Sequence, residues 1–100
     1  MLDLGRFTGF DWDEGNRHKS VSKHGVTPLE AEQVFANEPV LVIKDEPHSH
    51  GEVRYHALGT SNSGRLLQVT FTLRRDDTLV RVISSRPMNR TERRRYAEEA

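Results

Sequence analysis

The sequence predicts an α+β fold in which helices pack against one face of an antiparallel sheet, and three observations support this class. First, helix-like segments lie before residue 40, strand-like segments occupy 40–85, and a last helix-like segment follows. Second, the strand-like segments are rich in β-branched and aromatic residues. Third, the linkers between the last three of these segments are short and turn-like. We therefore expect a four-stranded antiparallel sheet with two N-terminal helices and one C-terminal helix.

The first helix is expected over residues 13–24. Asp13 and Glu14 lie at its start, whereas Lys19 and Lys23 lie towards its end, which matches the charge preference of a helix dipole. Gly25 follows as a stop, because glycine readily adopts the left-handed conformation that often ends a helix.

The second helix has a clear start signal. Thr27 is placed as its N-cap, Pro28 as its first helical residue and Glu30 three residues after the cap, which is the pattern of a capping box. Pro39 ends the helix because proline lacks the amide donor and disfavours a helical residue before it. The last helix is expected to open at a similar signal in residues 89–92 and to run to the C-terminus.

The strands of the expected sheet are 40–44, 53–59, 66–73 and 79–85. Residues 60–64 and 74–77 are turn-like linkers, so the last three strands should form an antiparallel meander. Residues 10–12 offer a further short strand at one edge. Residues 1–9 are interpreted as a disordered or edge segment of a single domain that spans residues 1–100.

Composition excludes several classes of protein. There is no cysteine, so neither disulfides nor thiolate metal sites hold the fold. The apolar stretches are far shorter than the roughly 20 residues that cross a bilayer, and no signal-peptide pattern opens the chain. These features favour a cytoplasmic protein without membrane contact. The mean hydropathy of −0.73 indicates that much of the surface faces water or a polar partner.

The charge is unevenly distributed along the chain. The formal net charge is zero, which by itself disfavours a general nucleic-acid binder. However, residues 81–95 contain six arginines and a single acidic residue, Glu92. The neutral total therefore conceals a basic C-terminal region.

Strand alternation predicts one apolar and one polar face of the sheet. In the second strand, Glu52, Arg54 and His56 lie opposite the apolar residues. In the fourth strand, Arg81 is expected on this polar face together with Ile83 and Ser85, with Ser84 on the other side. A carboxylate and several guanidinium groups would then share the polar face.

Such a set of side chains suits RNA cleavage without a metal or other cofactor. The ribose 2′-hydroxyl loses its proton and attacks the adjacent phosphate, and the departing oxygen takes up a proton. Glu52 is the candidate base, and Arg54, Arg81 and Arg86 are candidates to bind the phosphate and stabilise its growing charge. Lys23 or His24 is the candidate acid or electrostatic aid. The alternative is a solvated face with cross-strand ion pairs, which is the commoner role of such residues.

A second alternative to RNA cleavage is metal binding by the loop at residues 45–52. His48 and His50 lie beside carboxylates there and resemble ligands of zinc or nickel. No HExxH motif or cysteine framework accompanies them, and loop histidines are commonly exposed. We therefore expect no metal site.

An ordered set of motifs resembles the BrnT family of ribonuclease toxins. The resemblance runs from Phe10 to Tyr96 and is carried by the segments KHGV at 23–26, EVRY at 52–55, GRLL at 64–67, RVISSR at 81–86 and ERRRY at 92–96. It implies a RelE-like fold and a metal-independent endoribonuclease that halts translation. It also implies a BrnA-like antitoxin with a ribbon-helix-helix domain, through which the complex would bind operator DNA. The residues implied to carry the activity are Lys23, Glu52, Arg54, Arg81 and Arg86.

The remaining candidates are residues for RNA binding outside the cleavage site: Arg65, Arg90, Arg94, Arg95 and Tyr96. For the arginine run the ordinary interpretation is a solvated helix surface, and for Tyr96 it is a core anchor. A non-catalytic binding module, such as a toxin that has lost its activity, remains the competing class of function.

Overall fold

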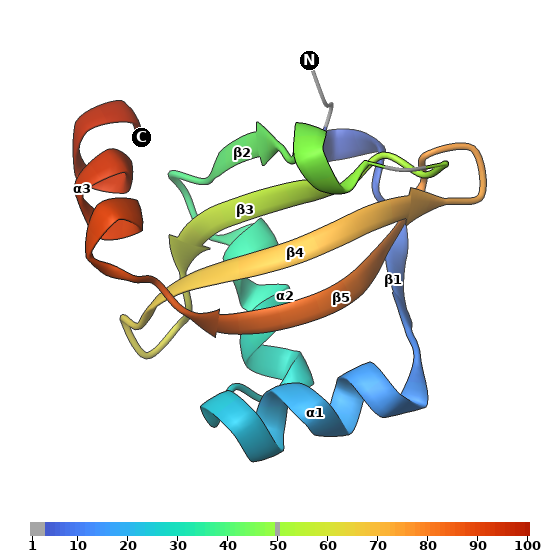
Figure 1. Ribbon diagram of the computed structural model, residues 1–100, viewed down its shortest axis with the longest axis horizontal. Helices are drawn as coiled ribbons and strands as arrows, with labels where there is room; N and C mark the ends of the chain where they lie inside the picture. The colour runs from blue at the N-terminus through green and yellow to red at the C-terminus, as the bar shows by residue number, and fades with distance from the viewer. Residues whose placement is uncertain (1–3, 50) are drawn as a thin grey trace.

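The computed structural model describes residues 4–49 and 51–100 and has an α+β fold (Figure 1). In the described residues, three α-helices and five strands form the main elements, one short 3-10 helix precedes them, and another lies between the second and third strands. In chain order the elements are η1 (Leu4–Arg6), β1 (Gly9–Trp12), α1 (Glu14–His24), α2 (Pro28–Ala36), β2 (Leu41–Lys44), η2 (Glu46–His48), β3 (Tyr55–Thr60), β4 (Leu66–Arg74), β5 (Leu79–Pro87) and α3 (Arg90–Glu99).

The strands form one mixed sheet in the order β1-β5-β4-β3-β2. The four strands from β2 to β5 pair antiparallel, as the sequence predicts. The expectation of a four-stranded antiparallel sheet is nevertheless wrong, because β1 joins as a fifth strand and runs parallel to β5. The segment considered as an optional edge strand is thus part of the sheet. Of the N-terminal segment, residues 4–9 are described, and Leu4–Arg6 forms the short helix η1.

A β-bulge in β5 corrects the predicted faces of this strand. Arg81 pairs with Thr72 and Arg86 pairs with Gln68, so five steps along β5 match four steps along β4. The irregularity falls between Thr70 and Phe71 of β4. Strict alternation would place Arg81 and Arg86 on opposite faces, whereas the bulge places both on the same face. It also reverses the prediction for residues 84 and 85, so the fully buried Ser85 lies on the core side.

The helix ends follow the local signals. Asp13 caps α1 by accepting hydrogen bonds from two backbone amides, and Gly25 ends it with a φ of 64°. Thr27 caps α2 through the amide of Glu30, but the Glu30 carboxylate turns to Arg65 instead of completing the expected capping box. The local signal therefore predicts the helix start, and a tertiary ion pair decides where the glutamate points.

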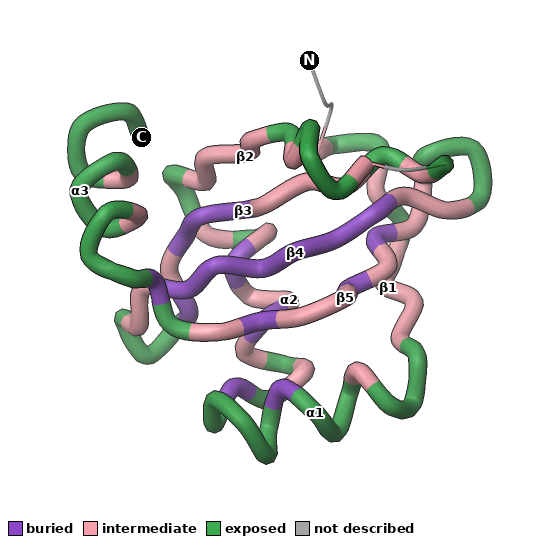
Figure 2. The backbone as a smooth tube through the Cα atoms, viewed as in Figure 1, coloured by how far each residue is buried: buried purple, intermediate pink, exposed green. Residues whose placement is uncertain are grey.

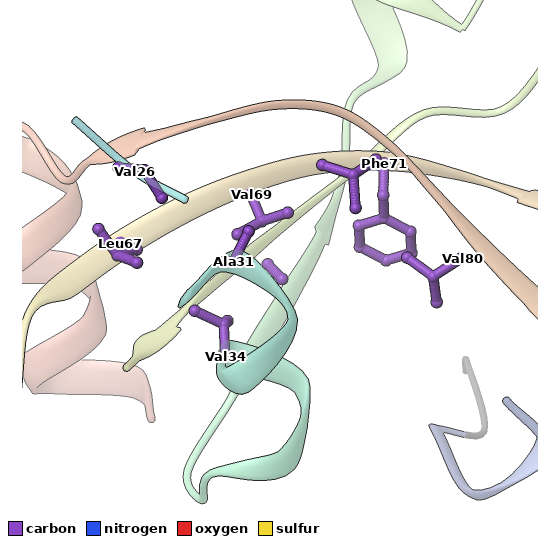
Figure 3. Close-up of a cluster of buried hydrophobic side chains, with 9 residues drawn as sticks. Val26, Ala31, Val34, Leu67, Val69, Phe71 and Val80 are labelled. Atoms are coloured by element: carbon purple, nitrogen blue, oxygen red, sulfur yellow. The ribbon is translucent and has the colours of Figure 1, made fainter. Parts of the chain in front are cut away.

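The core lies between the sheet and α2. Its centre is the cluster of Val26, Ala31, Val34, Ala57, Leu67, Val69, Phe71, Val80 and Val82, most of which Figure 3 shows. In Figure 1, α2 crosses behind the sheet, and α1 runs along the outer side of β5. Burial concentrates along β4 and in the neighbouring parts of β3 and β5, as Figure 2 shows. The face of the sheet opposite α2 is therefore the one left for polar chemistry.

Helix α1 packs along the part of the β5 edge that extends past its pairing with β1. Ser20 is the buried residue of α1, and its Oγ accepts a hydrogen bond of 3.1 Å from the backbone amide of Ser85. This contact satisfies a buried amide at the sheet edge. Within residues 4–49 and 51–100, no helix is long and apolar enough to span a bilayer.

Candidate active site on the open face of the sheet

The polar side of the sheet, opposite α2, is called the open face below. Strand register places polar side chains from β3, β4 and β5 on it, among them His56, Gln68, Thr70, Thr72, Arg74, Arg81, Ser84 and Arg86. Leu58, Thr60 and Leu66 lie on the same side, and Leu58 is buried. The middle of the open face is shielded, because the three β4 residues from Gln68 to Thr72 on this face are at most 7% exposed. The N-terminal turn of α3 borders one end of this face, and the loop before β3 borders the other.

Arg81 lies beside the parallel strand β1. It is directly opposite Asp11 in the register, and its Nη1 donates to the Asp11 carboxylate at 3.1 Å. Its Nη2 lies 3.6 Å from the carboxylate of Asp13. The Arg81 side chain is 30% exposed. The guanidinium is thus oriented by two carboxylates and remains accessible from solvent.

Arg86 lies under the first turn of α3. Its two terminal nitrogens donate to the two carboxylate oxygens of Glu92, each at 2.8 Å. These hydrogen bonds raise the pKa of the Arg86 guanidinium above its usual value, more than burial lowers it. Glu92 also completes a reciprocal capping box with Asn89, so one carboxylate fixes both the helix start and the arginine.

The Glu92 carboxyl group is held in its charged form. Burial raises its pKa, but the hydrogen bonds from Arg86 and from the Asn89 backbone, with the positive charges of Arg86 and His56, outweigh this effect. The pKa of Glu92 therefore lies below that of an ordinary glutamate. The Arg86–Glu92 pair is the most strongly bound ion pair of the open face, since it has two parallel charge-assisted hydrogen bonds.

Glu52 and Arg54 precede β3 rather than belonging to it, because the strand begins at Tyr55. Glu52 forms an ion pair with Arg74, and each of these side chains is 40% exposed. Arg74 shares the open face with Arg81, so Glu52 reaches this face as the sequence predicts. Its direct partner is Arg74 and not Arg81.

Arg54 continues the ladder between β2 and β3, since its carbonyl accepts from the amide of Asp45 at 2.8 Å. Its amide donates to the hydroxyl of Ser49. Arg54 is two residues before His56, so strand alternation places it on the same face of the sheet as His56. Among the described residues, no ion pair is recorded for its guanidinium, in contrast to Arg74, Arg81 and Arg86.

A chain of hydrogen bonds crosses the centre of the open face. His56 Nε2 lies 2.9 Å from the carboxylate of Asp45, and its Nδ1 lies 2.8 Å from the hydroxyl of Thr70. The amide nitrogen of Gln68 lies 3.2 Å from the same Nδ1 and donates to Glu92 at 3.3 Å. The chain therefore connects the loop before β3 to α3 across two strands.

Asp45 is held between two histidines. Burial raises the pKa of Asp45. The hydrogen bond from His48 and the charges of His56 and His48 lower it by a larger amount, so the net shift is downward. His48 is thus engaged with Asp45. His50 lies outside the described residues. Within the part of the chain that the structure describes, no group of three or more side chains is placed to hold a metal ion.

The other predicted site residues lie at the margins. Lys23 and His24 are exposed in the last turn of α1, along the side of β5. Arg65 bonds to the Glu30 carboxylate at 2.8 Å and to the Gly25 carbonyl at 3.0 Å, so it joins the two N-terminal helices to the β3–β4 turn. The structure does not bring these three side chains into contact with the arginines of the open face.

The remaining RNA-binding candidates lie on α3. Arg90, Arg94 and Arg95 are exposed, and Arg95 pairs with Glu99 one helical turn away. The Tyr96 hydroxyl donates to the carbonyl of Pro39 at 2.6 Å and lies 3.2 Å from the Thr60 hydroxyl. Tyr96 therefore ties α3 to the sheet, which is the anchoring role that the ordinary interpretation gives it.

Sequence reasoning missed several residues of the open face. The sequence gives Asp11 no role and places Asp13 only at a helix start, because the contact of Asp11 with Arg81 spans 70 residues and leaves no local signal. Arg74 was assigned to a turn. His56 was placed on the polar face but given no role, although its alternation with Glu52 and Arg54 was the available signal.

The Arg86–Glu92 ion pair should make the free energy of unfolding depend on pH in the acidic range. A carboxyl group with a lowered pKa stabilises the fold above its ordinary pKa and loses this contribution as the pH falls through its folded value. We expect Glu92→Gln to lower the free energy of unfolding by about 1–3 kcal/mol at neutral pH, with the difference shrinking as the pH falls below the ordinary glutamate pKa and through the lower folded value. Urea denaturation of both proteins at a series of pH values measures this. A difference that does not shrink on acidification would contradict it.

Comparison with known proteins agrees with this fold. The family model described as the ribonuclease toxin BrnT of type II toxin-antitoxin systems matches residues 12–92. A crystal structure of the ribonuclease toxin BrnT from Brucella abortus superposes with a TM-score of 0.58 at 23% identity, covering 82% of this chain and 97% of that one. A comparison with curated protein sequences gives no significant match.

The fold is thus an α+β toxin fold with an open polar sheet face. Because the family model covers most of the chain, from Trp12 to Glu92, this chain belongs to the BrnT family of ribonuclease toxins from type II toxin-antitoxin systems. An antitoxin partner follows from membership of such a system.

Proposed function

We propose that this protein is a metal-independent endoribonuclease of RelE-like fold that cleaves RNA on the open face and thereby inhibits translation. The observation that carries the proposal is the placement of Arg81 and Arg86 on one face by the bulge in β5. The register separates the two arginines by four residues of β4, about 13 Å, so both long side chains would turn inward to hold one phosphodiester and stabilise the charge that builds up during attack. Glu52, which reaches this face from the loop before β3, supplies a carboxylate.

The proposed reaction uses the ribose itself as the nucleophile. Glu52 takes the proton of the 2′-hydroxyl, the 2′-oxygen bonds to phosphorus, and the bond to the 5′-oxygen breaks as that oxygen gains a proton. Arg81 and Arg86 bind the phosphate, and the guanidinium of Arg54, for which the described residues include no ion-pair partner, adds a further contact. Substrate binding replaces the carboxylates that now neutralise the arginines, because phosphate accepts the same paired hydrogen bonds.

RNA contacts beyond the scissile phosphate are assigned to the exposed arginines of α3, Arg90, Arg94 and Arg95, with Arg65 and the last turn of α1 as outlying contributors. These side chains bind backbone phosphates through charge and give little sequence preference. Because the net charge of the chain is zero, we expect weak binding with a strong salt dependence. Tyr96 serves here by holding α3 in place.

The partner is proposed to be a BrnA-like antitoxin with a ribbon-helix-helix domain, and operator DNA would be bound only through that antitoxin. The cytoplasm is the compartment in which such a pair would act. The support for this partner is the family to which the chain belongs.

The test is incubation of the purified protein with RNA in excess EDTA, beside a DNA oligonucleotide of the same sequence. The proposal expects RNA to be cut and DNA to stay intact, because only RNA carries the attacking 2′-hydroxyl. Glu52→Ala is expected to abolish most of the cleavage while RNA binding persists. RNA that stays intact with EDTA, or DNA that is cut equally, would refute the proposed mechanism.

A non-catalytic binding module is the second candidate, and one observation favours it. Arg74, Arg81 and Arg86 all form intramolecular ion pairs, which would suit a toxin that has lost its activity and keeps its antitoxin contact. This candidate predicts affinity that is unchanged by Glu52→Ala, lost when the arginines are replaced, and never accompanied by a cleavage product.

A further inference from the structure

We propose that His56 is the general acid of RNA cleavage on the open face, the residue that protonates the departing 5′-oxygen. The inference deepens the proposed function and rests on it. Sequence reasoning selected Lys23 or His24 for this role, but both lie in the exposed last turn of α1. His56 is the histidine that strand register places among the site residues.

The position of His56 in the sheet brings it near the phosphate-binding side chains. It lies opposite Thr70 in β4, which in turn lies opposite Ser84 in β5. Arg86 lies two residues further along β5, on the same face. A phosphate bound by Arg86 in place of Glu92 would lie next to the Gln68 amide, which contacts both Glu92 and the His56 ring.

The contacts of the ring fit a proton donor that faces the site through Nδ1. Nε2 points at the Asp45 carboxylate 2.9 Å away, which fixes the orientation of the ring. In the protonated ring, Nδ1 carries a proton that faces the centre of the open face and donates it to the Thr70 hydroxyl 2.8 Å away, while the Gln68 amide nitrogen, which can only donate, keeps its hydrogen bond to Glu92. The side chain is 25% exposed, so substrate can reach it from solvent.

The neighbouring charged groups come from three elements around the ring. Asp45 and His48 lie on the loop before β3, Glu92 lies on α3, and Arg86 lies on β5. Glu92 is the group that phosphate would replace. In the proposed step, the bond between phosphorus and the 5′-oxygen breaks, the Nδ1 proton passes to that oxygen, and His56 is left neutral.

The experiment compares two substrates that differ in the leaving atom. One is an ordinary RNA oligonucleotide, and the other carries sulfur in place of the bridging 5′-oxygen at the cleaved bond. A thiolate leaves without a proton, so it does not need a general acid. We expect His56→Gln to slow cleavage of ordinary RNA by about 100-fold or more, and to leave cleavage of the sulfur-substituted RNA within a few-fold of wild type.

His18→Gln is the matched control, since His18 lies on α1 with 81% of its side chain exposed and pairs with Glu14, away from the open face. It should cleave both substrates at the wild-type rate. A measurement on the wild-type protein serves as an independent check. Its rate on ordinary RNA should fall at alkaline pH as the acid loses its proton, and this fall should be absent with the sulfur-substituted RNA.

The outcomes separate this inference from the proposed function. If wild type cuts both substrates but His56→Gln loses activity equally on both, or keeps it on both, His56 is not the acid. The same conclusion holds if the wild-type pH profiles coincide for the two substrates. If wild type cuts neither substrate, the proposed ribonuclease function itself fails, and this inference fails with it.

Discussion

Replacement of Arg81 by alanine is expected to reduce the rate of RNA cleavage by about 100-fold to 1,000-fold, which is the usual effect of removing one group that stabilises transition-state charge. The side chain lies on the open face, accessible to solvent and oriented by Asp11 and Asp13. Its loss removes a guanidinium and also leaves both carboxylates unpaired, which repels the phosphate. Single-turnover cleavage of a labelled RNA oligonucleotide measures the rate.

Two further variants make this result interpretable. Arg81→Lys keeps the charge but loses the paired donors, so we expect an intermediate rate. Arg17→Ala removes an exposed arginine from α1 and should leave the rate unchanged. Equal rates for wild type and Arg81→Ala would show that the reaction does not take place at this face. An equal loss with Arg17→Ala would indicate an effect of net charge alone.

The largest expected effect on stability is that of Phe71→Ala, which should lower the free energy of unfolding by about 3–5 kcal/mol. Phe71 is fully buried in the middle of β4. Its ring stacks on Tyr55 with centroids 5.4 Å apart and meets Phe35 edge-on at 5.1 Å. Removing the ring leaves a cavity that joins the sheet, α2 and the N-terminal segment, where Phe7 also contacts it.

Chemical denaturation of the variant and of wild type measures this difference. Leu29→Ala is the matched control, because Leu29 is 65% exposed on α2 and its truncation should change the stability by less than about 0.5 kcal/mol. A loss below about 1 kcal/mol for Phe71→Ala would contradict the packing described for this core.

The helices were predictable because their ends depend on neighbouring residues. Thr27, Asn89 and Gly25 each act through bonds to amides or carbonyls within a few positions, so the sequence carries the whole signal. The antiparallel pairs β3–β4 and β4–β5 were predictable for the same reason, since short turns join these strands. The orientation of the Glu30 side chain was not predictable, because its partner Arg65 lies 35 residues away in the sequence.

Two features of the sheet lay beyond local reasoning. The pairing of β1 with β5 joins residues 70 positions apart, and a parallel contact has no turn between its strands to reveal it. The bulge in β5 is one extra residue in an otherwise regular apolar alternation, and simple alternation cannot detect it. The bulge determines which residues make up the candidate site, because it places the Arg86 side chain on the same face as that of Arg81.

The candidate site was therefore anticipated in part. Alternation places Glu52 and Arg81 on one face, and Arg86 is a phosphate-binding candidate from the sequence, although strict alternation would turn it to the other face. The partners of these residues come from β1, from the end of β4 and from α3, and only the tertiary structure brings them together. The functional role of each residue remains a proposal that the cleavage experiments test.

The most direct test of the central claim, that RNA is cut at the open face by its own 2′-hydroxyl, is the chemistry of the new ends. Mass spectrometry of a short RNA incubated with the purified protein in EDTA identifies them. The account predicts fragments ending in a 2′,3′-cyclic phosphate and fragments beginning with a 5′-hydroxyl. Intact RNA, or fragments with a 3′-hydroxyl and a 5′-phosphate, would contradict it.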